Sequence, residues 1–264
     1  MNFELRQGGK EVRPMSVDIL RDSASARSQR RRNLKGEGYK RWFITGTDTN
    51  VGKTIVSCAL LQAAKLAGYQ SVGYKPVASG SLMTSVGIRN PDGLALQANS
   101  CNKALDYQQI NPFAFIEATS PHIASAATNQ KITLSALSQG LQQLEKKANW
   151  LVIEGAGGWF TPLSDNTTFA DWVEQEKLPV ILVVGIKLGC INHALLTAMA
   201  IKHARLPLAG WVANNILPVE SQWHKEYMAT LQRLLLPSPL LGSIPYLEQV
   251  EQQELGSYMN IALL

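Results

Sequence analysis

The 264-residue sequence has few cysteines and no long apolar run. Its three cysteines, Cys58, Cys101 and Cys190, are odd in number and far apart, so they match neither a disulfide framework nor a zinc site. No apolar stretch approaches the ~18 residues that a membrane span needs, and the first residues lack the apolar core of a secretory signal. We therefore expect a globular protein of the reducing cytoplasm, with no membrane partner.

The body of the chain also lacks a strong charge of either sign. The net charge is +5, but residues 1–41 hold eleven Lys and Arg against five Asp and Glu, which leaves 14 basic and 15 acidic residues in the remainder. We therefore expect no nucleic-acid surface on the folded part. Residues 1–40 have too few large apolar side chains to build a core. We expect a disordered extension there, with an arm for nucleic acid or a partner as the alternative.

Short apolar segments alternate with helical periodicity over residues 41–264, which we expect to form one domain. Runs rich in Val, Ile and Leu predict strands buried on both faces of a parallel sheet, at residues 42–45, 71–75, 150–154, 180–185, 208–214 and 240–244. The spacing of apolar residues predicts helices at residues 54–67, 133–148, 191–204 and 221–235. This alternation predicts an α/β fold of the P-loop NTPase type, with a doubly wound, mainly parallel sheet flanked by helices.

A glycine-bounded loop lies between the first predicted strand and the first predicted helix, at residues 46–54. Backbone N–H groups at a helix N-terminus, together with the helix dipole, favour a bound anion. Lys53 would reach the outer phosphates of a nucleotide, and the hydroxyl of Thr54 would bind magnesium. Five residues separate Gly46 from Gly52, where the standard pattern has four. A glycine turn before an ordinary helix is therefore the alternative.

Charged residues end two further predicted strands, where ligands bind in open parallel sheets. Lys75 could neutralise charge that develops during phosphoryl transfer, and Ser79 could hydrogen-bond the same substrate. Glu154 could hold magnesium, and the glycines after it allow the backbone to approach a ligand closely. A surface lysine and a solvated glutamate are the alternatives.

Three other positions stay open on the residues alone. Asp92 is either a second magnesium carboxylate or a turn aspartate, and the turn is favoured. Asn214, at a strand end, can both donate to and accept from a purine edge, and an asparagine turn is the alternative. We interpret Cys190 and His193 as a buried thiol and a hydrogen-bonded histidine, because no third residue orients them as nucleophile and base.

Together these segments resemble the dethiobiotin synthetase family of ATP-dependent ligases. The matching motifs are at residues 45–54, 73–80, 154–158, 179–185, 189–194 and 210–214, and the resemblance covers residues 41–264. This family uses five residues between the P-loop glycines, so the departure from the standard pattern supports the resemblance. It implies a homodimer that makes dethiobiotin, ADP and phosphate from 7,8-diaminononanoate, CO2 and ATP, with Mg2+. One amine captures CO2 as a carbamate, the carbamate attacks the γ-phosphate, and the second amine closes the ureido ring.

The resemblance also implies roles for individual residues. Catalysis would rest on Lys75, Lys53 and Thr49, and Mg2+ would bind Thr54, Asp92 and Glu154. The nucleotide would contact Asn50, Val51, Gly52, Lys53, Thr54, Ile55, Glu154, Gly155, Ala156, Gly157, Asn214, Asn215, Pro245, Tyr246 and Leu247. The diamine would meet Ser79 and, across the subunit interface, Gly189, Cys190, Ile191, Asn192 and Tyr227.

One departure from the family pattern and two alternatives remain. Asn50 stands where many relatives carry Glu, which removes a negative charge near the phosphates but no group that the mechanism needs. A switch ATPase of the partition or metallochaperone type is the first alternative. Those proteins commonly carry a second lysine early in the P-loop, where this chain has Thr47, Asp48 and Thr49. A paralogue that acts on another amine is the second.

Overall fold

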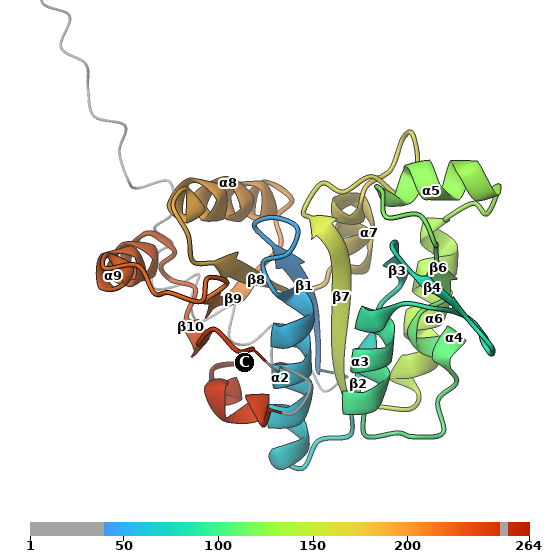
Figure 1. Ribbon diagram of the computed structural model, residues 1–264, viewed down its shortest axis with the longest axis horizontal. Helices are drawn as coiled ribbons and strands as arrows, with labels where there is room; N and C mark the ends of the chain where they lie inside the picture. The colour runs from blue at the N-terminus through green and yellow to red at the C-terminus, as the bar shows by residue number, and fades with distance from the viewer. Residues whose placement is uncertain (1–39, 249–252) are drawn as a thin grey trace, which may run out of the picture.

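The computed structural model describes residues 40–248 and 253–264 (Figure 1). Residues 1–39 of the expected extension lie outside the described residues. Lys40 already pairs with Trp150 in the sheet, so the first strand begins one residue before the expected domain boundary. Within the described ranges, no helix combines the length and the apolarity that crossing a bilayer requires.

Six parallel strands form the central sheet, and they are the six predicted strands. Their order is β10-β9-β8-β1-β7-β2, and every neighbouring pair is parallel. The bounds are β1 (Lys40–Gly46), β2 (Ser71–Tyr74), β7 (Trp150–Gly158), β8 (Val180–Gly185), β9 (Leu208–Asn214) and β10 (Leu240–Ile244). The prediction of a mainly parallel sheet is confirmed.

The four predicted helices are confirmed to within a few residues at their ends. They are α2 (Lys53–Leu66), α6 (Leu134–Glu145), α8 (Cys190–His203) and α9 (His224–Leu234). Shorter elements were missed because they offer too few turns or alternations to show a period. These are α3 (Pro91–Asn99), α4 (Tyr107–Ile110), α5 (Pro121–Thr128), α7 (Phe169–Glu176), β3 (Val77–Ala78), β4 (Leu82–Thr84), β5 (Gly87–Arg89), β6 (Phe113–Ala114), η3 (Leu255–Tyr258) and η4 (Ile261–Leu263).

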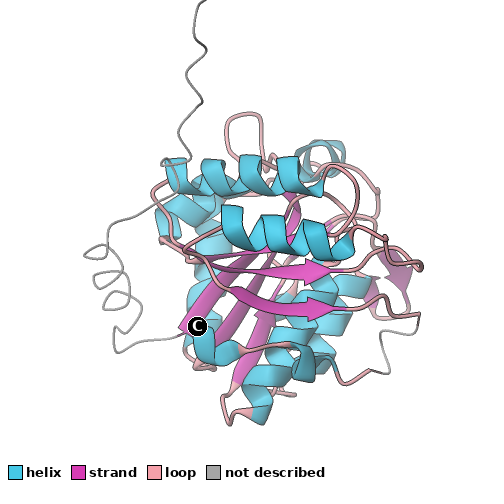
Figure 2. Ribbon diagram, turned by 90° about the vertical axis from the view of Figure 1, so that its left-hand side faces the viewer, coloured by secondary structure: helices cyan, strands magenta, loops and turns pink. Residues whose placement is uncertain are grey.

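Helices cover both faces of the sheet (Figure 2). Successive side chains of a strand point to opposite faces, so neighbouring residues of β2 pack against different helices. A Cβ on Gly73 would lie 2.8 Å from the Cβ of Leu96 and 3.1 Å from a methyl of Leu61, so this face packs against α3 and α2. Tyr74 points the other way, where its hydroxyl donates to the carbonyl of Leu137 in α6.

Buried aromatic side chains fill the second face. The ring of Phe43, on β1, lies 5.7 Å from that of Phe169 and 6.3 Å from that of Trp172, both in α7. A second apolar cluster, which includes Trp211 and Leu231, packs β8 and β9 against α8 and α9. Aromatic side chains bury large apolar areas, so these contacts fix the helices on the sheet and the strand ends relative to one another.

The strand predicted to end at Glu154 is longer in the structure, because β7 continues through the glycines to Gly158. Gly46 of β1 pairs with Gly158, and the register shifts between Ile44 and Gly46. A Cβ on Gly155 would lie 2.7 Å from the ring of Phe43, so a glycine allows the two strands and their side chains to pack this closely. The glycines therefore serve strand packing beside the site.

Candidate active site

The P-loop joins β1 to α2 and depends on two residues with positive φ. Asn50 has φ 60° and Gly52 has φ 87°. Glycine adopts this left-handed conformation without strain, and asparagine tolerates it better than most residues. At Gly52 a side chain would also clash, because a Cβ there would lie 2.1 Å from Nδ2 of Asn214. The backbone of the loop is therefore held tightly against the end of β9.

The start of α2 offers free donors to an anion. Gly52 precedes the helix, and no side chain caps its first N–H groups. The first N–H groups of a helix have no partner within it, and the helix dipole favours negative charge there. Nζ of Lys53 donates to the carbonyl of Asp48 at 3.2 Å, inside the loop. This arrangement suits the phosphates of a nucleotide.

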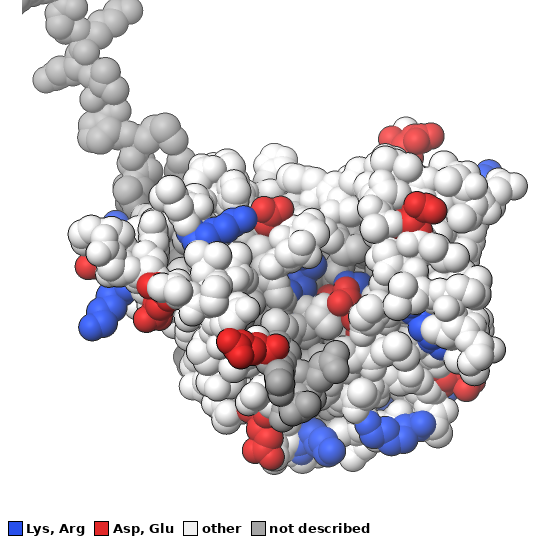
Figure 3. Space-filling view, viewed as in Figure 1, with Lys and Arg blue, Asp and Glu red and all other residues white. Residues whose placement is uncertain are grey.

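The ammonium of Lys75 lies between two carboxylates. Nζ donates to Oε1 of Glu154 at 2.6 Å, to Oδ2 of Asp92 at 3.0 Å and to the carbonyl of Gly155 at 3.1 Å. Oγ1 of Thr54 donates to the same oxygen of Glu154 at 2.9 Å. We call Lys75, Glu154, Asp92 and Thr54 the Lys75 cluster. Figure 3 shows Lys or Arg and Asp or Glu side chains close together in a hollow near the middle of the face in view.

Four separate elements supply the Lys75 cluster. Lys75 follows β2, Glu154 lies in β7, Thr54 in the first turn of α2, and Asp92 in the first turn of α3. β2 and β7 are neighbours in the sheet, and β1, which leads into the P-loop, lies on the other side of β7. Parallel strands end at the same edge, so the topology of the sheet brings Lys75, Glu154 and the P-loop together.

Burial and charge set the protonation of the two lysines. Burial alone would lower the pKa of Lys75, but the carboxylates of Glu154 and Asp92 outweigh it and raise that pKa above its usual value. Burial and then the charge of Lys75 lower the pKa of Lys53 to about 8. Burial would raise the pKa of Asp92, but the ammonium of Lys75 keeps it below its usual value. Lys75 therefore stays charged, whereas Lys53 can lose its proton at mildly alkaline pH.

The donor set of the cluster fits magnesium. Oε2 of Glu154 is buried and has no hydrogen-bond partner among the described residues. A buried carboxylate oxygen without a partner is costly, and a cation would remove that cost. No group of three or more His, Cys, Asp or Glu side chains lies together in the described part of the chain. Two carboxylates and one hydroxyl suit Mg2+, which usually keeps waters and binds substrate phosphates.

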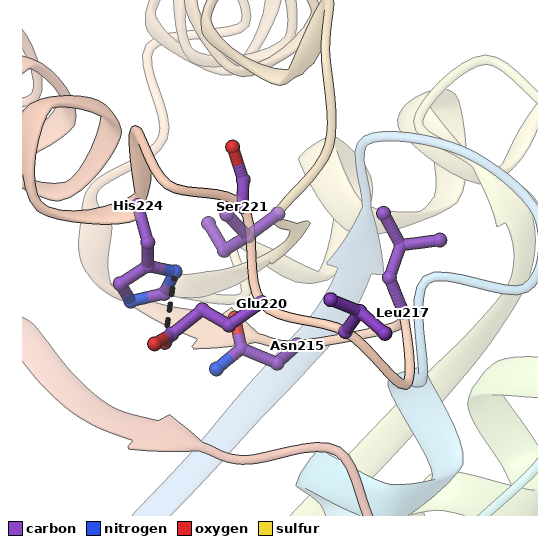
Figure 4. A pocket seen from close by; sticks show the side chains of 7 residues that line it. Asn215, Leu217, Glu220, Ser221 and His224 are labelled. Atoms are coloured by element: carbon purple, nitrogen blue, oxygen red, sulfur yellow. Dashed lines mark ion pairs between the residues drawn. The ribbon is translucent and has the colours of Figure 1, made fainter.

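The residues predicted for the adenine base lie at the ends of β9 and β10. Nδ2 of Asn214 donates to the carbonyl of Val51, so this side chain ties β9 to the P-loop. Asn215 lines a small pocket with Glu220 and His224, which form an ion pair at 3.4 Å (Figure 4). Ile186, Leu217, Val219 and Ser221 complete its wall. Pro245, Tyr246 and Leu247 form the loop that follows β10, and Tyr246 is exposed.

The other nucleotide residues lie in the P-loop and β7. Val51 is fully buried, and Ile55 is half-buried in the first turn of α2. Ala156 and Gly157 belong to the last residues of β7, and Gly157 has φ 62°. A Cβ on Gly157 would lie 2.5 Å from Oγ1 of Thr161, so glycine is required there.

The residues predicted for the diamine occupy three places. Thr49 is exposed in the P-loop, and Ser79 is half-buried four residues beyond Lys75. Gly189, with φ 92°, immediately precedes α8, so the backbone amides of Cys190, Ile191 and Asn192 lie in the first turn of that helix. Tyr227 lies in α9 and packs on the second apolar cluster. The Lys75 cluster is thus built from one set of predicted residues, while the α8 and α9 residues lie apart from it in the fold.

Two interpretations need correction. The turn favoured at Asp92 is wrong, because Asn90 caps α3 through a bond from the Asp92 N–H to its side-chain oxygen, and Pro91 is the first helical residue. Asparagine followed by proline is a helix-start signal that could have identified this helix. Cys190 is buried as expected. The expectation of a hydrogen-bonded His193 is wrong for Nδ1, which has no hydrogen-bond partner among the described residues.

Sequence reasoning missed the residues that support the cluster from behind. Asn90, Tyr107 and Asn111 are buried and connect by hydrogen bonds to the backbones of Lys75 and Asp92. It also missed the pair between Asp48 in the P-loop and Lys187 before α8, at 3.4 Å. Both side chains of that pair are partly exposed, so its contribution to stability is small.

Comparison with known proteins identifies relatives along the described chain. Residues 40–254 match the family model of an AAA domain. The ATP-dependent dethiobiotin synthetase BioD of Yersinia pestis bv. Antiqua (strain Angola) is 63% identical over 231 residues, which are 85% of this chain and 95% of the relative. The ATP-dependent dethiobiotin synthetase BioD 1 of Escherichia coli (strain K12) is 62% identical over 226 residues, which are 85% of this chain and 99% of the relative.

Solved structures share the fold at low sequence identity. The septum site-determining protein MinD from Pyrococcus horikoshii OT3, complexed with Mg-ADP, has a TM-score of 0.51 and 16% identity, with 83% of this chain and 92% of that chain covered. A ParA family ATPase from Chlorobium tepidum TLS has a TM-score of 0.50 and 13% identity, with 84% and 91% covered. These likenesses establish a P-loop ATPase fold.

Comparing Gly52→Ala with Gly68→Ala distinguishes the effect of backbone strain alone from the effect of disturbing the P-loop. Both glycines have φ 87°, so each substitution strains the backbone by about 1–2 kcal/mol. A Cβ at Gly68 has nothing within 4 Å, whereas at Gly52 it displaces the Asn214 side chain that holds Val51. We expect both variants to lose stability in urea unfolding, Gly52→Ala the more, and a loss of ATP affinity of about tenfold or more only for Gly52→Ala. Equal ATP affinities in the two variants would contradict this account of the loop.

Proposed function

Because this chain belongs to the dethiobiotin synthetase family, we propose that it closes the ureido ring of dethiobiotin from 7,8-diaminononanoate and CO2, at the expense of ATP. Its activity is that of an ATP-dependent ligase of biotin biosynthesis. The observation that carries the proposal is the buried ammonium of Lys75, held between Glu154 and Asp92 beside the free amides of a P-loop. That arrangement stabilises negative charge that moves between a carbamate and a transferring phosphoryl group.

The reaction needs charge neutralisation and alignment more than a protein nucleophile. In the proposed sequence, one amine of the substrate captures CO2, and an oxygen of the carbamate attacks the γ-phosphate and displaces ADP. The second amine then attacks the carbamate carbon, and phosphate leaves. Lys53 and the first amides of α2 hold the phosphates, and Lys75 faces the carbamate and the phosphoryl group as they approach each other.

Thr54, Asp92 and Glu154 are the residues that would hold Mg2+. When bound, this ion supplies positive charge to the phosphates of ATP. The unpaired Oε2 of Glu154 supports the assignment. Lys75 pairs with both carboxylates, which leaves this group with one net negative charge. A divalent cation would offset that charge, and the phosphates of ATP would offset the rest of the cation's charge.

The remaining predicted residues fall into a base region and a diamine region. We propose that Asn214 and Asn215, with Pro245, Tyr246 and Leu247, surround the adenine, and that Asn214 acts partly by holding the P-loop. Thr49 and Ser79 would lie beside the diamine.

We also propose a homodimer in which Gly189, Cys190, Ile191, Asn192 and Tyr227 of one subunit meet the carboxylate end of the other subunit's substrate. Exposed apolar side chains at Leu188, Leu196 and Met199 beside and along α8 support an interface there. The thiol of Cys190 is buried and its backbone N–H donates to the carbonyl of Lys187 at 3.0 Å, so such a contact would fall to its neighbours in the first turn of α8. A cytoplasmic location remains our expectation.

The direct test of the function is phosphate release from MgATP, with and without the diamine and bicarbonate, combined with mass detection of the product. We expect release that depends on the diamine and forms dethiobiotin in equal amount. Phosphate release without the diamine would favour a switch ATPase. No phosphate release even with the diamine present would favour a paralogue with another amine substrate.

Lys75→Ala tests the proposed role of the central cation. We expect turnover to fall by about 10²-fold or more, because a preorganised charge in the reacting site contributes on this scale. Lys65→Ala, on the exposed last turn of α2, is a matched control for the loss of a lysine. Steady-state kinetics with circular dichroism of both variants would measure the effect. A folded Lys75→Ala protein with near-wild-type turnover would refute the role.

The low pKa of Lys53 predicts that nucleotide binding takes up a proton at alkaline pH. Its pKa is about 8 in the free protein, and bound phosphates raise it, so above pH 8 the complex binds more protons than the free protein. ATP affinity should be nearly constant below that pH and fall above it. Calorimetry in two buffers at about pH 9 should find close to one proton taken up per nucleotide.

Lys53→Arg is the control for this proton uptake, because arginine stays charged throughout the range. The variant should bind ATP with little or no proton uptake at the same alkaline pH. Equal uptake by both proteins would show that another group is responsible.

A further inference from the structure

The hydroxyl of Tyr107 is a buried polar group that the proposed reaction does not use. Tyr107 begins α4 and is 6% exposed. Its oxygen accepts a hydrogen bond from the backbone N–H of Asn90 at 2.6 Å and donates one to Oδ1 of Asn111 at 2.7 Å. Burial raises the pKa of Tyr107, so the hydroxyl keeps the proton that it donates. Each of its two partners leads directly to a different residue of the Lys75 cluster.

The Asn111 branch holds Lys75. Nδ2 of Asn111 donates to the carbonyl of Lys75 at 2.7 Å, and the N–H of Lys75 donates to the carbonyl of Ile110 at 2.8 Å. Asn111 itself is 1% exposed, so no solvent competes for these bonds. Both backbone polar groups of Lys75 are therefore fixed by the end of α4 and the residue after it, rather than by a neighbouring strand of the central sheet.

The Asn90 branch holds Asp92 and Ser79. Oδ1 of Asn90 accepts from the N–H of Asp92 at 3.0 Å, and its Nδ2 donates to the carbonyl of Ser79 at 3.2 Å. Asn90 is 3% exposed. Because the Asn90 N–H is bound to the hydroxyl of Tyr107, the start of α3 is located by the same oxygen that orients Asn111.

The surroundings of Tyr107 leave its ring and hydroxyl little freedom. A Cβ on Gly93 would lie 2.8 Å from the hydroxyl oxygen, so α3 approaches Tyr107 closely only because that position is glycine. The guanidinium carbon of Arg89 lies 4.4 Å from the ring centroid, on the strand that leads into α3. A side chain locked in this way can transmit its position to the groups that it binds.

We propose that Tyr107 is a positioning residue that sets the distance between Lys75 and Asp92 through Asn111 and Asn90. The inference rests on the proposed function, in which Lys75 faces the reacting groups and Asp92 helps to hold the divalent cation. Groups behind metal ligands and catalytic side chains commonly change affinity or turnover by 10–100-fold when they are lost. Two charged side chains from different elements need such a shared support, since neither shares a strand or helix with the other.

Tyr107→Phe tests the proposal, because it removes one oxygen and keeps the ring. We expect the affinity of Mn2+ for the complex with a non-hydrolysable ATP analogue, measured from the electron paramagnetic resonance of free Mn2+, to fall about tenfold. We expect kcat to fall by a similar factor, with a smaller change in the KM for the diamine.

Tyr74→Phe is the matched control. Its hydroxyl is also buried and donates to a main-chain carbonyl, that of Leu137 at 3.0 Å, but it lies on the α6 face of the sheet. Both variants lose one buried hydroxyl, so both should lose thermal stability, Tyr107→Phe the more because it leaves two buried partners unbound. Only Tyr107→Phe should change Mn2+ affinity and kcat.

Asn111→Ala separates the two branches. It breaks the bond to the Lys75 carbonyl and the bond from the Tyr107 hydroxyl, but leaves the bond from the Asn90 N–H to Tyr107 in place. We expect kcat to fall while Mn2+ affinity stays within about twofold of that of the unaltered protein. Parallel losses in Tyr107→Phe, Tyr74→Phe and Asn111→Ala that follow only thermal stability would overturn the proposal.

Asp92→Asn distinguishes a failure of this inference from a failure of the proposed function. Weakened Mn2+ binding in Asp92→Asn, with unchanged binding in Tyr107→Phe, would overturn the positioning role alone. Unchanged Mn2+ binding in Asp92→Asn, in a protein without diamine-dependent phosphate release, would overturn the proposed site on which the inference rests.

Discussion

The buried ion pair between Lys75 and Glu154 is the interaction on which the rest of the site depends. Nζ and Oε1 lie 2.6 Å apart, and both side chains are almost completely removed from solvent. Desolvation of two charges costs several kcal/mol each in proteins, so such a pair persists only where its geometry is good and further hydrogen bonds satisfy it. Asp92, Gly155 and Thr54 supply those bonds. The pair therefore requires β2, β7, α2 and α3 to be in place together, which links the fold to the chemistry.

The arrangement explains why this site is built on the sheet rather than on mobile loops. Electrostatic stabilisation of a transition state works best when the charges are already oriented before the substrates arrive. Lys75 follows one buried strand, Glu154 lies in its neighbour, and the P-loop begins at the end of the next. The apolar cores on both faces of the sheet hold these strand ends, and the network around Tyr107 holds the one carboxylate, that of Asp92, which comes from outside the sheet.

Local patterns in the sequence were enough to predict the buried strands of the sheet and the P-loop. The apolar runs that became β8, β9 and β10 were predicted to the residue, and the glycines, Lys53 and Thr54 predicted the P-loop. Resemblance to a family added Asp92, which the residues alone favoured as a turn. The network around Tyr107 was not predicted, because it joins residues 75, 90, 107 and 111 through buried hydrogen bonds that carry no periodic signal. The continuation of β7 through its glycines was missed for a related reason, since packing against Phe43 overrides the turn tendency of glycine.

The central claim about the reaction is that a carbamate oxygen attacks the γ-phosphate of ATP. Its most direct test is the origin of the oxygen that the released phosphate gains. If a carbamate oxygen attacks the γ-phosphate and that bond to phosphorus survives ring closure, ¹⁸O from labelled CO2 must appear in phosphate. The experiment would use a large excess of labelled CO2, follow its exchange with water in parallel, and analyse phosphate by mass spectrometry early in the reaction. The account predicts one labelled oxygen from CO2 in each phosphate. If dethiobiotin forms but the oxygen that phosphate gains comes from water and not from CO2, the account is contradicted.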